Sequence, residues 1–470
     1  MTATFLAALL VQFVMIALMR HRLGRRWLCR PVTVFAATSV VYLGIAPALL
    51  AVPSIGATDT YRRGIDRGYI DAADLIMSAA MLALTLAYLL TRPERAVTRD
   101  AGPGTTIAAR VLDWRLLALA CVPLTLFTAA GRGYNDGLGA GRGTALATNL
   151  VVTFFIIVVV VTAAGFLLRH GGRWFLPVLI VQTVILAIAG ERTPVLMDAI
   201  TLIVMLAFAG VRIPAHHLAC AGLLTVVVIL SISGIRAQTG RGMYYTNSGV
   251  TARVGALATG LSAAGGSSGA ADSPGLIAQF AVRMSAVDYG GAILQAVSEG
   301  QPRLSPVYVP ESMLLVVPSL FWPAKLGQGE ALAPAQLQID DFGLQDINFI
   351  PGAPGLYLGV LPPAWLVILF ALLGAVFGWF ERWLLRVRTP ARMVLLAGAV
   401  EAACHFEGGL PTMLVQMRSA GVLALAVCAV TALRTSRPRL RLPSLVMPLL
   451  DAAGPRAATG GLTRLGRGRW

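Results

Sequence analysis

Long apolar runs separated by short polar connections dominate the chain. A helix rises 1.5 Å per residue, so about 20 apolar residues are needed to cross a bilayer core about 30 Å thick. Eleven runs approach that length, at residues 3–19, 32–52, 71–90, 116–130, 146–168, 174–190, 194–211, 217–235, 355–380, 391–406 and 410–432. The pattern therefore predicts an all-α, polytopic membrane bundle of about eleven transmembrane helices.

The connection between the eighth and ninth runs is far longer than the others and covers residues 236–354. A connection of this length is usually functional or forms a small domain. Residues 276–299 carry a rough apolar stripe, which predicts a helix. The apolar run 311–322 is too short to span a membrane and contains Pro318, so we expect a re-entrant or interfacial segment there.

Charge orients these spans. The chain has 470 residues, of which 57% are hydrophobic and only 13% charged, and it carries 38 Lys and Arg against 22 Asp and Glu, a net charge of +16. This composition excludes a cytosolic enzyme and a disordered protein. Alternate connections, together with the C-terminal tail, hold 25 of the 38 basic residues and should face the cytoplasm. We therefore expect the N-terminus outside, the C-terminus inside and no role for nucleic acid.

This orientation divides the chain into four parts. They are a membrane bundle of about eight spans (1–235), a long extracytoplasmic loop (236–354), about three further spans (355–432) and a basic cytoplasmic tail (433–470). No cysteine–histidine spacing or HExxH motif indicates a metal, and no glycine-rich loop before a Lys-Ser/Thr indicates a nucleotide. We expect neither a metal nor a cofactor.

Cations on the expected outer side are the first candidates for function, because the orientation rule does not explain them. Arg192 lies in a turn before the seventh span, Arg236 ends the eighth span, and Arg283 lies in the expected loop helix. Guanidinium groups bind phosphate oxygens bidentately, which favours lipid headgroups or a lipid-linked pyrophosphate as ligands. A simple anchored turn is the alternative for Arg192. Lys325 is a further outer cation, with snorkelling beside Trp322 as its alternative role.

Polar residues near the end of the tenth span are candidates for acid–base chemistry. Glu401 and His405 are four residues apart and share one helix face. A carboxylate beside an imidazole orients the ring and raises its basicity, as a general base requires. The alternative is a buried hydrogen bond between helices. Asp288, in the expected loop helix, is a third candidate.

Several segments occur in an order that resembles the Wzy-type O-antigen or oligosaccharide repeat-unit polymerases. The resemblance covers roughly residues 190–420 and rests on placement more than on a strict motif. The segments are GERTP, RMSAVDYGG, PSLFWPAKLG, INFIPGAPGLYLGVL and LLGAVFG. The resemblance implies a multi-pass protein of the bacterial cytoplasmic membrane that acts in exopolysaccharide or surface polysaccharide synthesis.

The resemblance also implies an activity. A polyprenyl-pyrophosphate-linked oligosaccharide would be the donor at the outer face and a second lipid-linked unit the acceptor, without nucleotide or metal. Its partners would be membrane lipids, a flippase and chain-length regulator proteins. A transporter or flippase for a lipid-linked glycan or another anion is the alternative class. An O-antigen-ligase-like transferase is the alternative within the enzyme class.

The resemblance assigns roles to the candidate residues. Pyrophosphate binding would fall to Arg192, Arg236 and Arg283, with Lys325 as a further cation. The general base that activates the acceptor hydroxyl would be His405 first, then Asp288 or Glu401.

Overall fold

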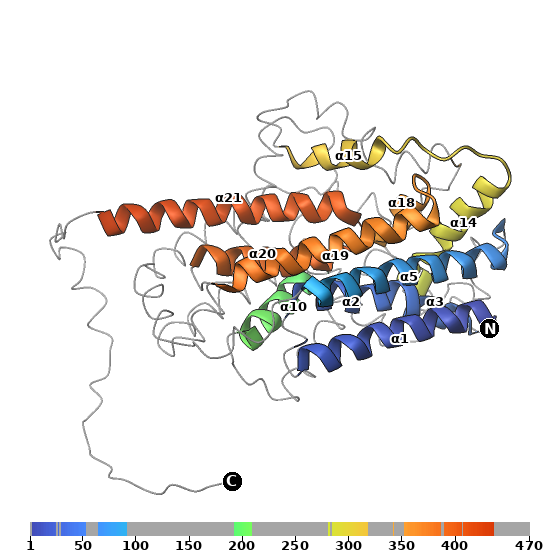
Figure 1. The fold of residues 1–470 in the computed structure, drawn as a ribbon, viewed down its shortest axis with the longest axis horizontal. Coiled ribbons are helices and arrows are strands. Elements are labelled where there is room, and N and C mark those ends of the chain that lie inside the picture. Colours follow the sequence, from blue (N-terminus) through green and yellow to red (C-terminus); the bar gives the residue numbers. More distant parts are fainter. Residues whose placement is uncertain are drawn as a thin grey trace, which may run out of the picture.

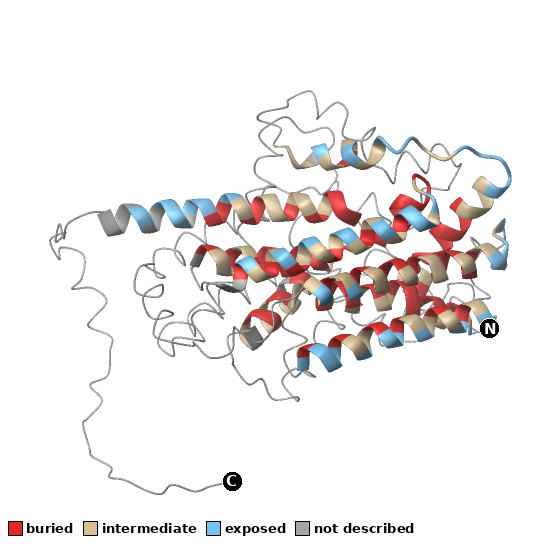
Figure 2. Ribbon diagram, in the orientation of Figure 1, coloured by how far each residue is buried: buried red, intermediate tan, exposed pale blue. Residues whose placement is uncertain are grey.

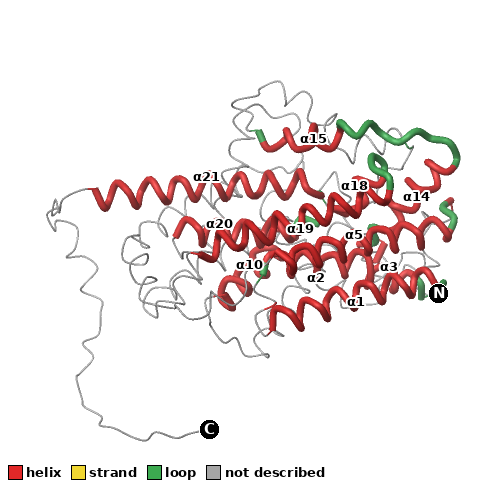
Figure 3. Tube along the Cα trace, in the orientation of Figure 1, coloured by secondary structure: helices red, strands yellow, loops and turns green. Residues whose placement is uncertain are grey.

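The structure is a computed structural model that describes about half of the chain. The described residues are 2–24, 27, 30–52, 64–91, 192–208, 281–282, 284–317, 342, 352–386, 390–406 and 408–436. Every regular element within them is helical (Figure 3). Helical structure is confirmed for these residues.

The elements follow one another along the chain with connections that the structure describes only in part. They are α1 (Ala3–Leu23), α2 (Pro31–Val40), the π-helix η2 (Val41–Ile45), α3 (Ala46–Leu50), α5 (Arg67–Thr91), α10 (Arg192–Phe208), α14 (Val287–Ser298), α15 (Tyr308–Met313), the 3₁₀-helix η5 (Leu314–Val316), α18 (Gly352–Leu358), α19 (Pro363–Arg386), α20 (Pro390–Cys404) and α21 (Gly409–Ser436).

Four helical stretches of the described residues are long and apolar enough to cross a membrane. They are Ala3–Leu23, Pro31–Leu50, Arg67–Thr91 and Pro363–Leu384. Long apolar helices are the feature that the hydrophobic pattern predicts for a membrane protein. The spans predicted at 116–130, 146–168, 174–190 and 217–235 lie outside the described residues.

The long helices lie side by side along the long axis of the bundle (Figure 1). α5 is central, because it packs on α19, α14 and α1. The N-terminal ends of α1 and α5 lie at the same end as α14 and α18, whereas α21 extends toward the opposite end. Buried residues concentrate along the inner faces of these helices, as the colouring of Figure 2 shows. Met77, Met81 and Leu84 of α5 are fully buried in this core.

Two glycines allow α5 and α19 to approach closely. A Cβ atom at Gly374 would collide with the backbone carbonyl of Leu84, and one at Gly378 would collide with the hydroxyl of Thr91. Small residues at such contacts are typical of helices that pack in membranes, where close van der Waals contact drives association. The glycines therefore fix the spacing of the central helix pair.

Two predicted elements differ from the structure. The helix predicted over 276–299 is interrupted at Ser285 and Ala286, and α14 starts only at Val287. The ninth span was predicted from residue 355, but α18 ends at Leu358 and the membrane-length helix starts at Pro363. Two consecutive prolines cause the second break, since a residue before proline avoids the helical conformation and proline fits the first helical turn.

Candidate functional site

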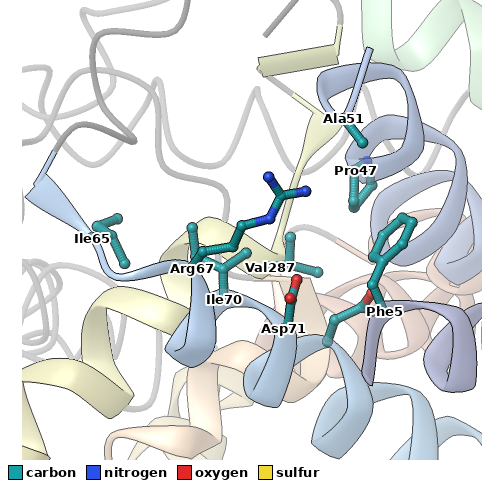
Figure 4. Close-up of a pocket in the computed structure, with 9 residues that line it drawn as sticks. Phe5, Pro47, Ala51, Ile65, Arg67, Ile70, Asp71 and Val287 are labelled. Carbon is teal, nitrogen blue, oxygen red and sulfur yellow. The ribbon is translucent and has the colours of Figure 1, made fainter. Parts of the chain in front are cut away.

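A pocket of about 190 Å³ lies at the end of the bundle where α1 and α5 begin. Figure 4 shows side chains from several elements converging on it. The lining residues are Phe5 from α1, Pro47 from α3, Ala51 just after α3, Ile65 just before α5, Arg67, Ile70, Asp71 and Asp74 at the start of α5, and Val287 from α14. The pocket thus joins an apolar wall to a cation and two carboxyl groups.

The two carboxyl groups belong to Asp71 and Asp74. They are three residues apart on α5, so they share one helix face, and their residues are only 6% and 1% exposed. Asp71 accepts a hydrogen bond from the hydroxyl of Thr2. Asp74 Oδ1 accepts one from Ser78 Oγ at 3.3 Å. Asp74 Oδ2 is buried and has no hydrogen-bond partner among the described residues, so the hydrogen bonding of this pocket-lining carboxyl group is incomplete.

Arg67 lies one helical turn before Asp71. In Figure 4 its guanidinium extends toward Pro47, while the carboxylate of Asp71 lies between Val287 and Phe5. Arg67 and Asp71 are placed for an i,i+4 pair, but no ion pair joins them in the part of the chain that the structure describes. The guanidinium therefore remains available to a ligand that enters the pocket.

Asp288 adds a third carboxyl group beside the pocket. It lies in the first turn of α14, is only 6% exposed, and acts electrostatically on Asp74, as Asp71 does. Glycines bring α14 close to α5: a Cβ atom at Gly291 would lie 2.9 Å from the Cα of Ile70. The next residue, Tyr289, is fully buried, and burial raises the pKa of its phenol above the usual range. Its hydroxyl stays protonated.

The π-helix η2 holds the start of α14. The backbone N–H of Ala286 donates a hydrogen bond of 3.2 Å to the carbonyl of Tyr42, inside η2. The wider turn of a π-helix disturbs the regular ladder of the α-helix, and such turns are frequent at functional sites. This contact sets the position from which Asp288 projects.

His405 and Glu401 lie at the end of α20. The helix ends at Cys404, and the backbone N–H of His405 donates to the carbonyl of Ala402 at 3.1 Å. The ring Nε2 of His405, which follows α20, forms a hydrogen bond of 3.0 Å with Nε2 of Gln416 on α21. Glu401 is buried, at 6% exposed.

Gly352 lies between the segment that carries Asp288 and the segment that carries His405. Its φ of +61° suits glycine, and a Cβ atom there would lie 2.8 Å from the ring of Phe406 and 3.0 Å from Cβ of Ala286. The segment before Asp288 and the segment after His405 therefore meet at the first residue of α18. The structure brings these two segments together at the end of the bundle that contains the pocket.

The predicted pyrophosphate ligands are described only in part. Arg192 is the first residue of α10, which packs on α20. Arg236, Arg283 and Lys325 lie outside the described residues. Their proposed role stays a prediction.

Sequence reasoning missed Arg67, Asp71 and Asp74. The signal was present, because a charged residue inside a predicted span is a functional candidate. Asp71 and Asp74 fall within the predicted span 71–90, and Arg67 precedes it by one turn. The long apolar run that follows these residues predicts a membrane span so strongly that the charged residues at its start received no functional role.

The pocket offers both hydrogen-bond acceptors and a hydrogen-bond donor to a polar ligand. Carboxylate oxygens accept hydrogen bonds from hydroxyl or amine groups, and a guanidinium donates to oxygens. Within the described ranges, no three His, Cys, Asp or Glu side chains are grouped so that they could hold a metal ion.

Comparison with known proteins finds no matching family model and no similar curated protein or solved structure.

Proposed function

We propose that this protein is a membrane glycosyltransferase that extends a polysaccharide from polyprenyl-pyrophosphate-linked oligosaccharides, as its resemblance to repeat-unit polymerases implies. The observation that carries the proposal is a pocket lined by Arg67 and two buried carboxyl groups, Asp71 and Asp74. A third buried carboxyl group, that of Asp288, acts electrostatically on Asp74. Glycosyl transfer to a hydroxyl acceptor needs a base for the hydroxyl proton and cations for the leaving group.

The distribution of charge supports an active face on the outer side. Basic residues gather at the end of the bundle opposite the pocket: Arg20 and Arg22 end α1, and Arg392 stacks on Trp383 near the end of α19. Basic residues favour the cytoplasmic side. The pocket and Asp288 would then face outward, where a flipped lipid-linked glycan is found.

In this proposal Asp288 is the general base, ahead of His405, because it neighbours the carboxyl groups of the pocket, whereas His405 contacts Gln416. Asp288 takes the proton of the acceptor hydroxyl as that oxygen attacks the anomeric carbon of the donor. The bond between that carbon and the phosphate oxygen breaks, and its electron pair leaves with the polyprenyl pyrophosphate. Arg192, Arg236 and Arg283, with Lys325, stabilise the negative charge that develops on the leaving group.

Replacing the proposed base tests the function. Asp288→Asn keeps the shape of the side chain but removes its basicity, so the rate of chain extension should fall by about 10²- to 10⁴-fold. The measurement is the length distribution of glycan that membranes make from labelled lipid-linked repeat units. Single repeat units should accumulate on the carrier.

The matched control is Glu299→Gln, which makes the same carboxyl-to-amide change at the exposed residue that follows α14. It should extend chains at the normal rate. Normal extension by Asp288→Asn would refute the assignment of the base. Finished polymer on the carrier in a deletion strain would identify a ligase instead of a polymerase.

A transporter or flippase for a lipid-linked glycan is the second candidate function. It is favoured by Asp74, which lies about two turns inside a candidate span and is buried, since such residues often mark transport pathways. Proteoliposomes distinguish the two functions. A transporter moves labelled lipid-linked substrate across the bilayer without joining units, whereas a polymerase joins them.

A further inference from the structure

The pocket at the start of α5 is lined by a carboxyl group with a buried oxygen that is unpaired within the described part of the chain, which raises the question of what the pocket binds. Asp74 Oδ2 has lost its contact with water, and no donor among the described residues replaces it. A buried polar atom without a hydrogen-bond partner is unfavourable. Because Asp74 also lines the pocket, a ligand there lies beside a carboxyl group whose hydrogen bonds to the described residues are incomplete.

The chemistry of the walls narrows the class of ligand. Phe5, Pro47 and Val287 provide apolar surface, while Asp71 and Asp74 accept hydrogen bonds on the neighbouring side. A sugar ring has this combination, with C–H groups on its faces and hydroxyl donors at its edge. The guanidinium of Arg67 on the same pocket disfavours a free cation and can donate to the oxygens of a sugar.

The size of the pocket sets a limit on the ligand. Its volume of about 190 Å³ lies below the roughly 300 Å³ at which pockets for drug-sized ligands begin. One monosaccharide ring is the matching size, and a longer glycan would continue outside the pocket.

We propose that this pocket is a subsite for a single sugar ring, in which Asp71 and Asp74 accept hydrogen bonds from ring hydroxyls, Arg67 donates to a ring or hydroxyl oxygen, and Phe5 packs against a ring face. The inference rests on the proposed function, because it assigns one sugar of the lipid-linked glycan to this subsite. It concerns binding alone and includes no chemical step.

Binding of simple glycosides to the full-length chain tests the subsite. The protein is placed in lipid nanodiscs free of glycoside detergents, and saturation-transfer NMR measures the methyl glycosides of glucose, galactose, mannose and N-acetylglucosamine. At least one should bind saturably. Asp74→Asn replaces one carboxyl oxygen with an amide NH2 group, which cannot accept a hydrogen bond, and should weaken that glycoside about tenfold or more.

A second variant blocks the pocket without touching its carboxyl groups. Ala51→Trp fills the space beside Pro47 and should abolish glycoside binding. Glu299→Gln, the matched surface change, should bind as the unchanged protein does. The proposal is overturned if no glycoside of the panel binds, if Asp74→Asn and Ala51→Trp both bind normally, or if ammonium or sodium ions displace the glycoside.

The outcome is independent of the test of the proposed function. Glycoside binding that is lost in Asp74→Asn supports the subsite even where no chain extension is found, and then only the polymerase proposal fails. Normal chain extension without any glycoside binding overturns the subsite alone.

Discussion

Two buried acidic groups lie at opposite ends of the helix pair α5 and α19, and their surroundings differ. Glu381, near the end of α19, uses both carboxylate oxygens: Oε1 pairs with Arg30, and Oε2 accepts a hydrogen bond of 2.5 Å from the hydroxyl of Tyr88. Asp74, near the start of α5, lines the pocket. Its Oδ1 accepts a hydrogen bond, whereas its buried Oδ2 has no partner among the residues that the structure describes.

The difference separates a structural role from a functional one. The Glu381 group connects three elements, because Arg30 precedes α2, Tyr88 lies in α5 and Glu381 lies in α19. A buried charge with all its hydrogen bonds made holds helices in place. A buried carboxyl group whose hydrogen bonds to the described residues are incomplete contributes less to the fold, so a ligand is the better explanation for the presence of Asp74. The comparison predicts opposite effects on stability when the two groups are changed.

Arg30→Met should have the largest effect on stability. It removes the cation of a mostly buried pair and leaves Glu381, whose side chain is only 7% exposed, without its counter-charge. Breaking such a pair lowers the free energy of unfolding by about 3–5 kcal/mol. Thermal unfolding of the purified protein in nanodiscs measures this change as a lower midpoint temperature.

The double variant Arg30→Met with Glu381→Gln is the control. It removes both charges together and should recover much of the lost stability, since no uncompensated charge remains. If Arg30→Met alone unfolds at the normal temperature, the pair does not hold the helices together. The structural role of Glu381, and with it the contrast with Asp74, would then be refuted.

The sequence predicts the apolar helices well and the polar sites poorly, for physical reasons. Helices such as Arg67–Thr91 follow from the density of apolar residues alone. The partner of Glu381 is 351 residues away along the chain, and no local pattern indicates such a pair. Asp288 was a candidate from its place in the loop, but its proximity to Asp74 depends on the packing of α14 against α5.

Breaks within helices are the second kind of feature that the hydrophobic pattern does not predict. The double proline at 362–363 was visible, yet hydropathy alone continued the predicted span across it from residue 355. The π-helix over Val41–Ile45 leaves no signal in the apolar pattern, because the same residues would suit an α-helix. Both breaks affect the placement of the candidate site, so hydrophobic periodicity alone could not position it.

Gly374→Ala should have an intermediate effect, because it disturbs the contact that connects the two acidic groups. The added methyl group would collide with the backbone of Leu84, which cannot move as a side chain can. Overpacking of this kind lowers the free energy of unfolding by about 1–3 kcal/mol. Denaturant unfolding in mixed micelles is a suitable measurement.

Gly421→Ala is the matched control, since a Cβ atom there meets nothing within 4 Å on α21. Alanine is the better helix former, so this variant should be as stable as the unchanged protein or more stable by about 0.5–1 kcal/mol. Equal destabilisation by both substitutions would show that loss of glycine itself, and not the contact of α5 with α19, is responsible.

Asp74→Asn should have the smallest effect on stability, and with the opposite sign from Arg30→Met. The substitution replaces a carboxyl group that lies near those of Asp71 and Asp288 with a neutral amide, which can both donate and accept hydrogen bonds. We expect the free energy of unfolding to rise by about 1 kcal/mol, as is common where a functional site carries an unsatisfied group. The midpoint of thermal unfolding, measured in the absence of glycoside, should therefore increase. A fall as large as that of Arg30→Met would mean that Asp74 supports the fold as Glu381 does, and the distinction between the two ends of α5 would then be lost.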